Sequence, residues 1–405
     1  MLSILLLLSF SGCSVDRHMA RKSMELMNKM DAEPQWSLRP RKKIVWNEAV
    51  QMMMTRNLEM QRARQSIQQA ERAVTSVFTQ IIPGVNLDLM MTKELSQLTN
   101  VTQDNLEYNT NILFSVPSPT QIPFDYYSAK AAVYSVKKST EMKERELISR
   151  LYRQVMLYQN AMVARKAQLE EIPYDDDGTL RQKADAEWGD KLQEVSMGFA
   201  ELLGNMEAQW LIDPDTMPRI DWNRYKKSSR KLDLLVVTMA AMELEVSRLQ
   251  VLNTKMKFFP SVDVNFYSPS LFTGKGGTYQ GFFAGANDIQ VNMSLREELD
   301  TRLNVWNQYK TARENHRMLQ ERVRLELLKR RDKVAALIKS REDFESWESA
   351  TRKVLAFKKA QTVASGEDYL QQRKALKDIY KELDSEAAKN AEVEAALIME
   401  YGWLK

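Results

Sequence analysis

The chain has 405 residues, of which 44% are hydrophobic and 28% are charged, with only 13 glycines and 11 prolines. Few helix-breaking residues, together with many aliphatic and charged ones, favour long helices. The net charge is only +4 and the two signs are interspersed, which excludes the concentrated basic face of a nucleic-acid-binding protein.

The first apolar run ends at the only cysteine of the chain. In LLLLSFSGCS, small residues directly precede Cys13, which is similar to a bacterial lipoprotein signal whose cysteine becomes the lipidated first residue. We expect residues 1–12 to be a cleaved signal peptide and 13–35 an N-terminal tether with a short helix. Ser14 indicates sorting to the outer membrane. Phe10 and the missing basic residues before the run depart from the pattern; an upstream start codon would explain the missing charge, and an ordinary signal with an incidental cysteine is the alternative.

The first half of the chain changes its periodicity at a proline. Residues 45–82 show the three- and four-residue apolar spacing of a helix, with Asn47 as the candidate N-cap. Pro83 ends this helix, because proline lacks the N–H and disfavours helical geometry in the residue before it. Alternating apolar and polar residues then predict strands at about 84–92 and 107–117.

Two further helices complete the first half. The spacing predicts them at Asp125 to Glu171 and at 180–212. The breaker EIPYDDDGT separates the two helices, and DPDTMP ends the second.

The second half repeats this order. A helix over 220–258 ends at Pro260, and strands follow at about 261–268 and 287–296. A helix of about 65 residues then runs from Leu299 to a break at ASGED and resumes to the C-terminus. The two helix-to-strand steps, FTQIIPGVNLDLMM and KMKFFPSVDVNFYS, lie 177 positions apart (260 − 83). The chain therefore reads as two structural repeats, 36–212 and 213–405.

The four strands suit a membrane. No segment after the N-terminal run approaches the ~20 apolar residues of a spanning helix, whereas strands of about 8–11 residues match the ~9–11 that cross a bilayer when tilted. Four strands cannot close a barrel, but three chains supply twelve. An ordinary antiparallel sheet packed on one face is the alternative. The polar strand residues that we predict to face a lumen are Asn86, Asp88, Asn111, Asp263, Asn265, Gln290 and Asn292.

Trp46 and Trp222 open the two halves, and ASGEDYLQQRKAL occupies 364–376. The order, spacing and duplication of these features resemble the TolC-like outer-membrane efflux protein family over about residues 36–404. The resemblance implies a mainly α protein with a membrane β-barrel portion: a homotrimer with a 12-stranded barrel in the outer membrane and a long α-helical barrel in the periplasm. It also implies a periplasmic adaptor that couples the trimer to an inner-membrane transporter of RND or ABC type. The fourth strand departs from the family by continuing into LREELDTR without a proline or glycine step.

The resemblance places one periplasmic tip at Gly366 and Asp368. For the first repeat two candidates stay open: the breaker at 173–178, and Gly189, which lies 177 positions before Gly366. We favour 173–178, because a proline and DDDG break a helix more firmly than one glycine. This tip would contact the adaptor.

A dense acidic run lies in the favoured tip. Threefold symmetry would gather up to nine carboxylates around the mouth and make an acidic gate, whereas a solvated acidic loop is the alternative. The run consists of Asp175, Asp176 and Asp177, and Gly178 follows it at the same tip.

Catalytic motifs are missing from the sequence. It has two histidines, His18 and His316, and no Gly-rich phosphate loop, metal-spaced His/Cys cluster or nucleophile elbow. The 23 methionines suit adaptable packing better than a soft-metal site. We therefore predict no enzyme activity, cofactor or metal. A structural or tethering periplasmic coiled-coil lipoprotein is the alternative function; it would carry strict heptads and would not need amphipathic strands.

Overall fold

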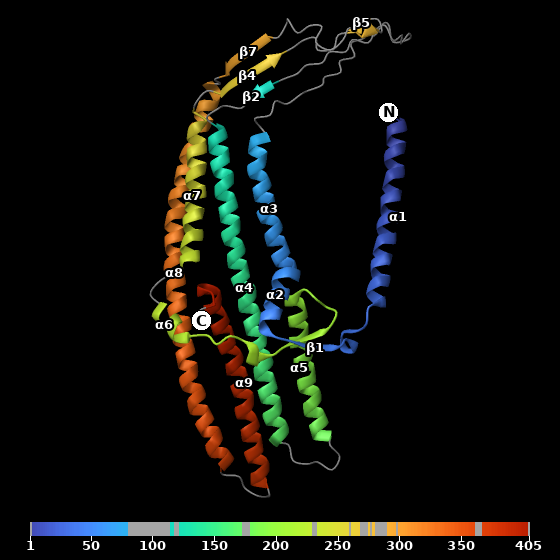
Figure 1. Cartoon of the computed structure of the whole chain (residues 1–405), viewed down its shortest axis with the longest axis vertical. Helices are drawn as coiled ribbons and strands as arrows, with labels where there is room; N and C mark the ends of the chain where they lie inside the picture. Colours follow the sequence, from blue (N-terminus) through green and yellow to red (C-terminus); the bar gives the residue numbers. More distant parts are fainter. Residues whose placement is uncertain are drawn as a thin grey trace. The chain divides into compact units, whose positions relative to one another are not determined.

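A computed structural model of the chain is mainly helical (Figure 1). It describes residues 2–79, 114–116, 121–171, 179–228, 233–258, 261–267, 274–275, 278–279, 290–296, 299–360 and 367–403. The chain divides into two compact units. Unit 1 comprises Met1–Asn57, Arg150–Pro218 and Glu348–Ala391, and unit 2 comprises Leu58–Ser149, Arg219–Trp347 and Glu392–Lys405. Three long helices contribute residues to both units: α4, α8 and α9.

The elements follow one another along the chain as helices interrupted by short strands. The α-helices are α1 (Leu2–Ala32), α2 (Trp46–Arg56), α3 (Leu58–Thr79), α4 (Gln121–Glu171), α5 (Thr179–Leu203), α6 (Trp222–Ser228), α7 (Leu234–Met256), α8 (Leu299–Ala360) and α9 (Glu367–Tyr401). The strands are β1 (Arg41–Ile44), β2 (Phe114–Val116), β3 (Gln209–Ile212), β4 (Ser261–Tyr267), β5 (Gly274–Lys275), β6 (Thr278–Tyr279) and β7 (Gln290–Arg296). Two short 3₁₀ helices are η1 (Trp36–Leu38) and η4 (Pro214–Thr216). None of the helices in the described part of the chain is both long enough and apolar enough to cross a membrane.

The helix predicted over 45–82 is two helices, and its predicted cap is wrong. Asn57 separates α2 from α3 with an extended backbone, and its side-chain Nδ2 donates to the Leu202 carbonyl oxygen over 2.8 Å. Val45 rather than Asn47 is the N-cap residue of α2, and it makes no side-chain cap hydrogen bond. The Trp46 N–H instead donates to Thr216 Oγ1 over 2.9 Å. Both features depend on partners that are distant in sequence.

The helix predicted over 180–212 ends at Leu203. Gly204 has a φ of 64°, and the Asn205 N–H donates to the Ala200 carbonyl oxygen over 3.0 Å, which is a glycine-terminated helix end. Residues 209–212 then form β3, which pairs in parallel with β1 from Arg41↔Gln209 to Ile44↔Ile212. The core of unit 1 contains the fully buried side chains of Met53, Phe199, Leu203 and Ile212. Burial of QWLI beside β1 therefore overrides its helical spacing.

The helix predicted over 220–258 is also divided. Its parts are α6 and α7, and Asp233 caps α7 by accepting a 2.9 Å hydrogen bond from the Leu235 N–H. In unit 2, Tyr225 of α6 packs with Val334 of α8 and with Leu397 and Tyr401 of α9. The short helix α6 is thus part of the core of unit 2, and the Asp233 cap marks the start of the separate helix α7.

Two antiparallel helix pairs occupy unit 2. Between α3 and α4, ion pairs join Glu59 to Lys143 over 2.6 Å and Glu71 to Lys137 over 2.9 Å. Between α7 and α8, Ser247 Oγ lies 3.1 Å from Nδ1 of His316. In the second pair, Phe258 just past the end of α7 also meets Trp306 of α8, with ring centroids 6.2 Å apart. In both pairs the contacting positions rise on one helix as they fall on the other, so the two helices of each pair run in opposite directions.

Candidate functional site

A three-stranded antiparallel sheet in unit 2 has the order β2-β4-β7 (Figure 1). Its central strand, β4, pairs with β7 over seven residues, from Ser261↔Arg296 to Tyr267↔Gln290. It pairs with β2 from Phe114↔Phe266 to Val116↔Val264. The register determines which predicted site residues share a face.

One face of this sheet is polar. Asp263, Asn265 and Tyr267 alternate along β4 and so lie on the same face. Their partners on β7 are Ser294, Asn292 and Gln290. On the other side, Ser115 of β2 pairs with Asn265. The described strands therefore bring Asp263, Asn265, Gln290 and Asn292 together.

The opposite face is apolar throughout. On β4 it consists of Val262, Val264 and Phe266, whose β7 partners are Leu295, Met293 and Val291. On β2 it consists of Phe114 and Val116. A sheet that is polar on one face and apolar on the other suits a boundary between water and an apolar medium.

The helices before the two predicted helix-to-strand steps end shortly before the prolines. Helices α3 and α7 end at Thr79 and Met256, each four positions before its proline (83 − 79 and 260 − 256). Several predicted site residues lie outside the described residues: Pro83, Pro260, Asn86, Asp88 and Asn111. Cys13 lies within α1.

The helix ends at the candidate tips are described, although the connections are not. Helix α4 ends at Glu171 and α5 begins at Thr179, while α8 ends at Ala360 and α9 begins at Glu367, which places Asp368 in the first turn of α9. Gly189 lies inside α5, so it is not the turn between helices, and that alternative is excluded. The other candidate tip residues, Asp175, Asp176, Asp177, Gly178 and Gly366, lie outside the described residues.

Polar contacts in unit 1 join the helices that lead to these ends. Gln154 of α4 donates its Nε2 hydrogen to the Val195 carbonyl oxygen of α5 over 3.0 Å. Gln372 of α9 donates to the Lys358 carbonyl oxygen of α8 over 3.0 Å. Lys191 of α5 pairs with Asp384 of α9 at 2.5 Å. The sequence indicated none of these cross-helix partners.

Ion pairs in unit 2 were also missed from the sequence. Arg341 of α8 donates from Nε to Glu394 of α9 over 3.1 Å, and its guanidinium carbon lies 4.2 Å from the ring centroid of Trp222. Glu394 is only 5% exposed. A second pair joins Arg330 to Glu400. From the sequence alone, charged residues on a helix are expected to face water. Only the fold therefore identifies Arg341 and Arg330 as partners of Glu394 and Glu400.

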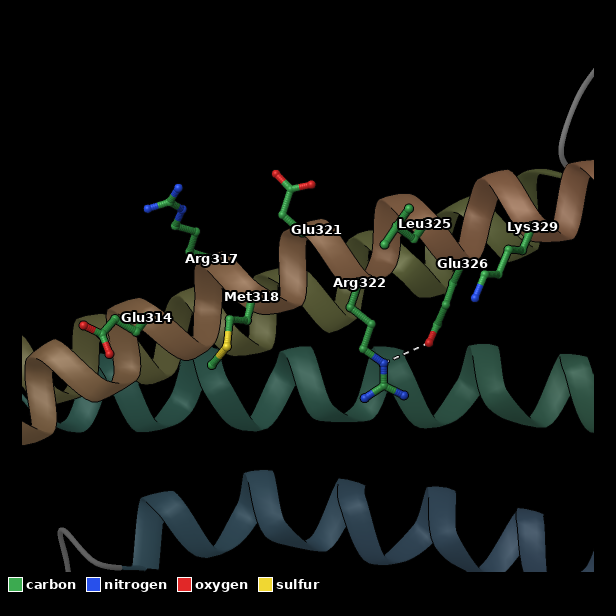
Figure 2. Close-up of a pocket in the computed structure, with 8 residues that line it drawn as sticks. All are labelled: Glu314, Arg317, Met318, Glu321, Arg322, Leu325, Glu326 and Lys329. Atoms are coloured by element: carbon green, nitrogen blue, oxygen red, sulfur yellow. Dashed lines mark hydrogen bonds and ion pairs between the residues drawn. The ribbon is translucent and has the colours of Figure 1, made fainter.

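A shallow groove runs along α8 in unit 2. Figure 2 shows its lining as residues of a single helix, with Arg322 Nε donating to Glu326 over 2.9 Å. This hydrogen bond raises the pKa of Arg322. Met318 and Leu325 are largely exposed. Because small-molecule sites enclose their ligand with converging groups, a groove on one helix is a surface feature and not a reaction site. Within the described residues, no three His, Cys, Asp or Glu side chains form a group that could hold a metal ion.

Comparison with known proteins identifies the fold. No protein-family model and no curated protein matches the chain. A structure of CusC, reported for conformational changes accompanying folding and transmembrane channel formation, matches with a TM-score of 0.64 and 12% identity over 92% of this chain and 97% of that one. The CmeC outer membrane channel of Campylobacter jejuni matches with a TM-score of 0.59 and 15% identity over 88% and 85%. The outer membrane protein VceC of Vibrio cholerae matches with a TM-score of 0.60 and 12% identity over 88% of this chain and 96% of that one. The resemblance predicted from the sequence is confirmed at the level of the fold.

Proposed function

We propose that this chain, which has the fold of bacterial outer-membrane channels, is the outer-membrane component of a tripartite efflux or export system. It acts as a passive homotrimeric duct that crosses the outer membrane and extends into the periplasm. A periplasmic adaptor couples it to an inner-membrane transporter of RND or ABC type, which supplies the energy. A structural or tethering coiled-coil lipoprotein is the alternative.

The register of the β2-β4-β7 sheet carries this proposal. Its polar and apolar faces match the two sides of a water-filled barrel wall in lipid. Lipid excludes open sheet edges because unpaired backbone groups cost several kcal/mol there. Four strands from each of three protomers close a 12-stranded barrel and remove the edges. A tethering protein would have no use for this two-faced sheet.

The helices support the periplasmic part of the duct. Helix α8 has 62 residues and α4 has 51. At 1.5 Å per residue these rise about 93 and 77 Å, far longer than the helices of an ordinary globular domain. The connections after Glu171 and Ala360 would form the periplasmic tips that meet the adaptor, with Asp175, Asp176 and Asp177 as an acidic gate.

Paired cysteine variants test the wall directly. We expect Asn265→Cys, on the polar face, to be modified from water by a charged thiol reagent that lowers single-channel conductance. Val264→Cys, the adjacent residue on the apolar face, is expected to resist the same reagent. The unsubstituted protein controls for Cys13. Equal modification of both variants would contradict the barrel wall, whereas missing conductance and missing heat-resistant trimers would favour the tether.

Two further experiments test the anchor and the gate. Cys13→Ser is expected to abolish incorporation of labelled palmitate, and continued incorporation would exclude this lipidation site. Replacing Asp175, Asp176 and Asp177 together by Asn is expected to lower cation selectivity, because a ring of carboxylates attracts cations. Unchanged selectivity and pH response would show that this run is only a solvated loop.

A further inference from the structure

Two aromatic–lysine clusters lie in unit 2 at the strand ends of its helix pairs. The first cluster consists of Phe78 on α3 with Tyr126 and Lys130 on α4; its rings meet edge to face at 5.2 Å and 61°, and Lys130 Nζ lies 4.6 Å from the Tyr126 ring centroid. The second consists of Phe258, two residues past the end of α7, with Trp306 and Lys310 on α8. There the ring centroids are 6.2 Å apart at 66°, and Lys310 Nζ lies 5.4 Å from the Trp306 centroid.

The two clusters lie on or directly beside corresponding helices of the two halves, α3 and α4 in the first and α7 and α8 in the second. Each member of the second follows its equivalent by 180 positions (258 − 78, 306 − 126 and 310 − 130), three more than the 177 positions between Pro83 and Pro260, so the two clusters match in their helices and contacts and not in the register of the prolines. The same edge-to-face aromatic pair with a lysine over the same ring therefore occurs once in each half. Packing of one seam would explain a single aromatic pair, but it does not require an exposed lysine over the equivalent ring in both halves.

The clusters face outward and carry positive charge. Phe78 is 51% and Trp306 is 44% exposed, and both lysines are exposed. Around the second cluster, residues 249–258 and 299–313 contain five cations and one carboxylate: Lys255, Lys257, Arg302, Lys310, Arg313 and Asp300. Around the first, residues 71–79 and 122–138 contain four cations and two carboxylates: Arg72, Lys130, Lys137, Lys138, Glu71 and Asp125. Lys137 pairs with Glu71 over 2.9 Å and Lys138 with Glu141 over 2.7 Å. Burial raises the pKa of Asp125 above its ordinary value. Cations outnumber carboxylates around both clusters, and an anionic partner complements the ammonium groups of Lys130 and Lys310.

The chain connection fixes the depth of the second cluster relative to the sheet. Phe258 lies three positions before Ser261, the first residue of β4, and three residues span at most about 10 Å. The polar layer on each side of a bilayer is about 5–8 Å thick. If the two-faced sheet spans the hydrocarbon core, the aromatic rings therefore lie at the level of the headgroups, where Trp and Tyr are enriched.

We propose that the two clusters bind the headgroups of anionic phospholipids in the periplasmic leaflet of the outer membrane. The ammonium groups of Lys130 and Lys310 bind the lipid phosphate, while the rings beneath them occupy the boundary between headgroups and acyl chains. With three protomers, six equivalent clusters surround the barrel. This inference rests on the proposed function, because it requires the sheet to cross a bilayer.

Lipid-specific fluorescence quenching tests the second cluster. The full-length protein is reconstituted in phosphatidylethanolamine vesicles that contain a minority of phosphatidylglycerol, with bromine on the acyl chains of either lipid. The component of tryptophan emission lost in Trp306→Phe reports the lipid beside this residue. We expect Lys310→Gln to lower the preference for phosphatidylglycerol about two- to fivefold, and the effect to shrink at high salt. Tyr126→Trp, with and without Lys130→Gln, reports the first cluster in the same way.

A matched variant and two further measurements separate the outcomes. Lys329→Gln removes an exposed lysine 19 positions further along α8 (329 − 310), about 28 Å away, and is expected to leave the preference unchanged. An unchanged preference in Lys310→Gln would overturn the inference, as would loss of heat-resistant trimers, which would assign the cluster to a contact with a second copy. Single-channel conductance in the same vesicles tests the proposed function separately. Conductance without a change in lipid preference refutes only the lipid site.

Discussion

Replacement of Arg341 by methionine tests the contacts that hold the C-terminal part of α9 in unit 2. The change removes the 3.1 Å hydrogen bond to Glu394, which is only 5% exposed, and the contact with the Trp222 ring. A hydrogen bond to a charged group contributes about 1.5–3 kcal/mol and a partly buried cation–π contact about 1 kcal/mol. The local opening free energy of this segment should therefore fall by about 3 kcal/mol.

Hydrogen–deuterium exchange measures this loss where it occurs. A change of about 3 kcal/mol corresponds to a roughly hundredfold loss of protection in peptides that cover residues 392–403. Arg322→Met on the same helix is the control, because Arg322 pairs with Glu326 at a side-chain exposure of 71% and 57%, where water screens the pair, and its loss should leave protection nearly unchanged. Arg341→Lys should restore part of the protection, since lysine keeps the charge but not the planar group. Equal effects of Arg341→Met and Arg322→Met would refute the assigned role of the buried pair.

Four other substitutions have defined outcomes. Gly204→Ala should lower the free energy of unfolding, measured by thermal melting, by about 1–3 kcal/mol, because φ is 64° and an added Cβ would lie 2.5 Å from the Arg56 carbonyl oxygen. Gly189→Ala, with open space around its Cβ in α5, should instead raise stability by about 1 kcal/mol; destabilisation would contradict its helical position. Tyr225→Phe should cost about 1–2 kcal/mol in a melting experiment by removing the 2.5 Å hydrogen bond to the Gly402 carbonyl oxygen, and an unchanged melt would show that this bond contributes nothing. Burial raises the pKa of Glu144 above its ordinary 4.5, so the folded chain binds the proton more tightly than the unfolded chain and stability falls as the pH rises from 4.5 through the folded pKa. Glu144→Gln should therefore melt higher than the parent at neutral pH, with the gain lost below pH 4.5; a gain independent of pH would assign it to another cause.

The two periods of the sequence predicted most of the fold. The 3.6-residue spacing identified the helical segments, and the two-residue alternation identified strands that lie at Ser261–Tyr267 and Gln290–Arg296. The same alternation assigned the polar residues of each strand to one face, and the register of the sheet pairs residues of that face, such as Asn265 with Asn292. These predictions succeeded because side-chain direction in a helix or strand follows from local backbone geometry.

The interruptions could not be predicted in this way. Asn57 breaks a helical pattern because it finds the Leu202 carbonyl, and QWLI leaves a helical pattern because β1 offers a parallel partner. The effect of a glycine on a helix was also ambiguous in the sequence. Gly189 lies inside a helix and Gly204 ends one, although neither has a proline nearby in the sequence. In each case the deciding contact comes from a distant segment or from the space around the residue.

The sequence by itself determined the types of the long helices and of β4 and β7, the repeated order of these elements and the two faces of each of these strands, because these depend on the order of side chains along the chain. The tertiary structure decided which charges are partners, as in Arg341 and Glu394, and which aromatic side chains meet in the two clusters, because these depend on distances between helices. Hydrophobic spacing is a local property, whereas hydrogen bonds and ring contacts require two segments to meet within a few ångströms.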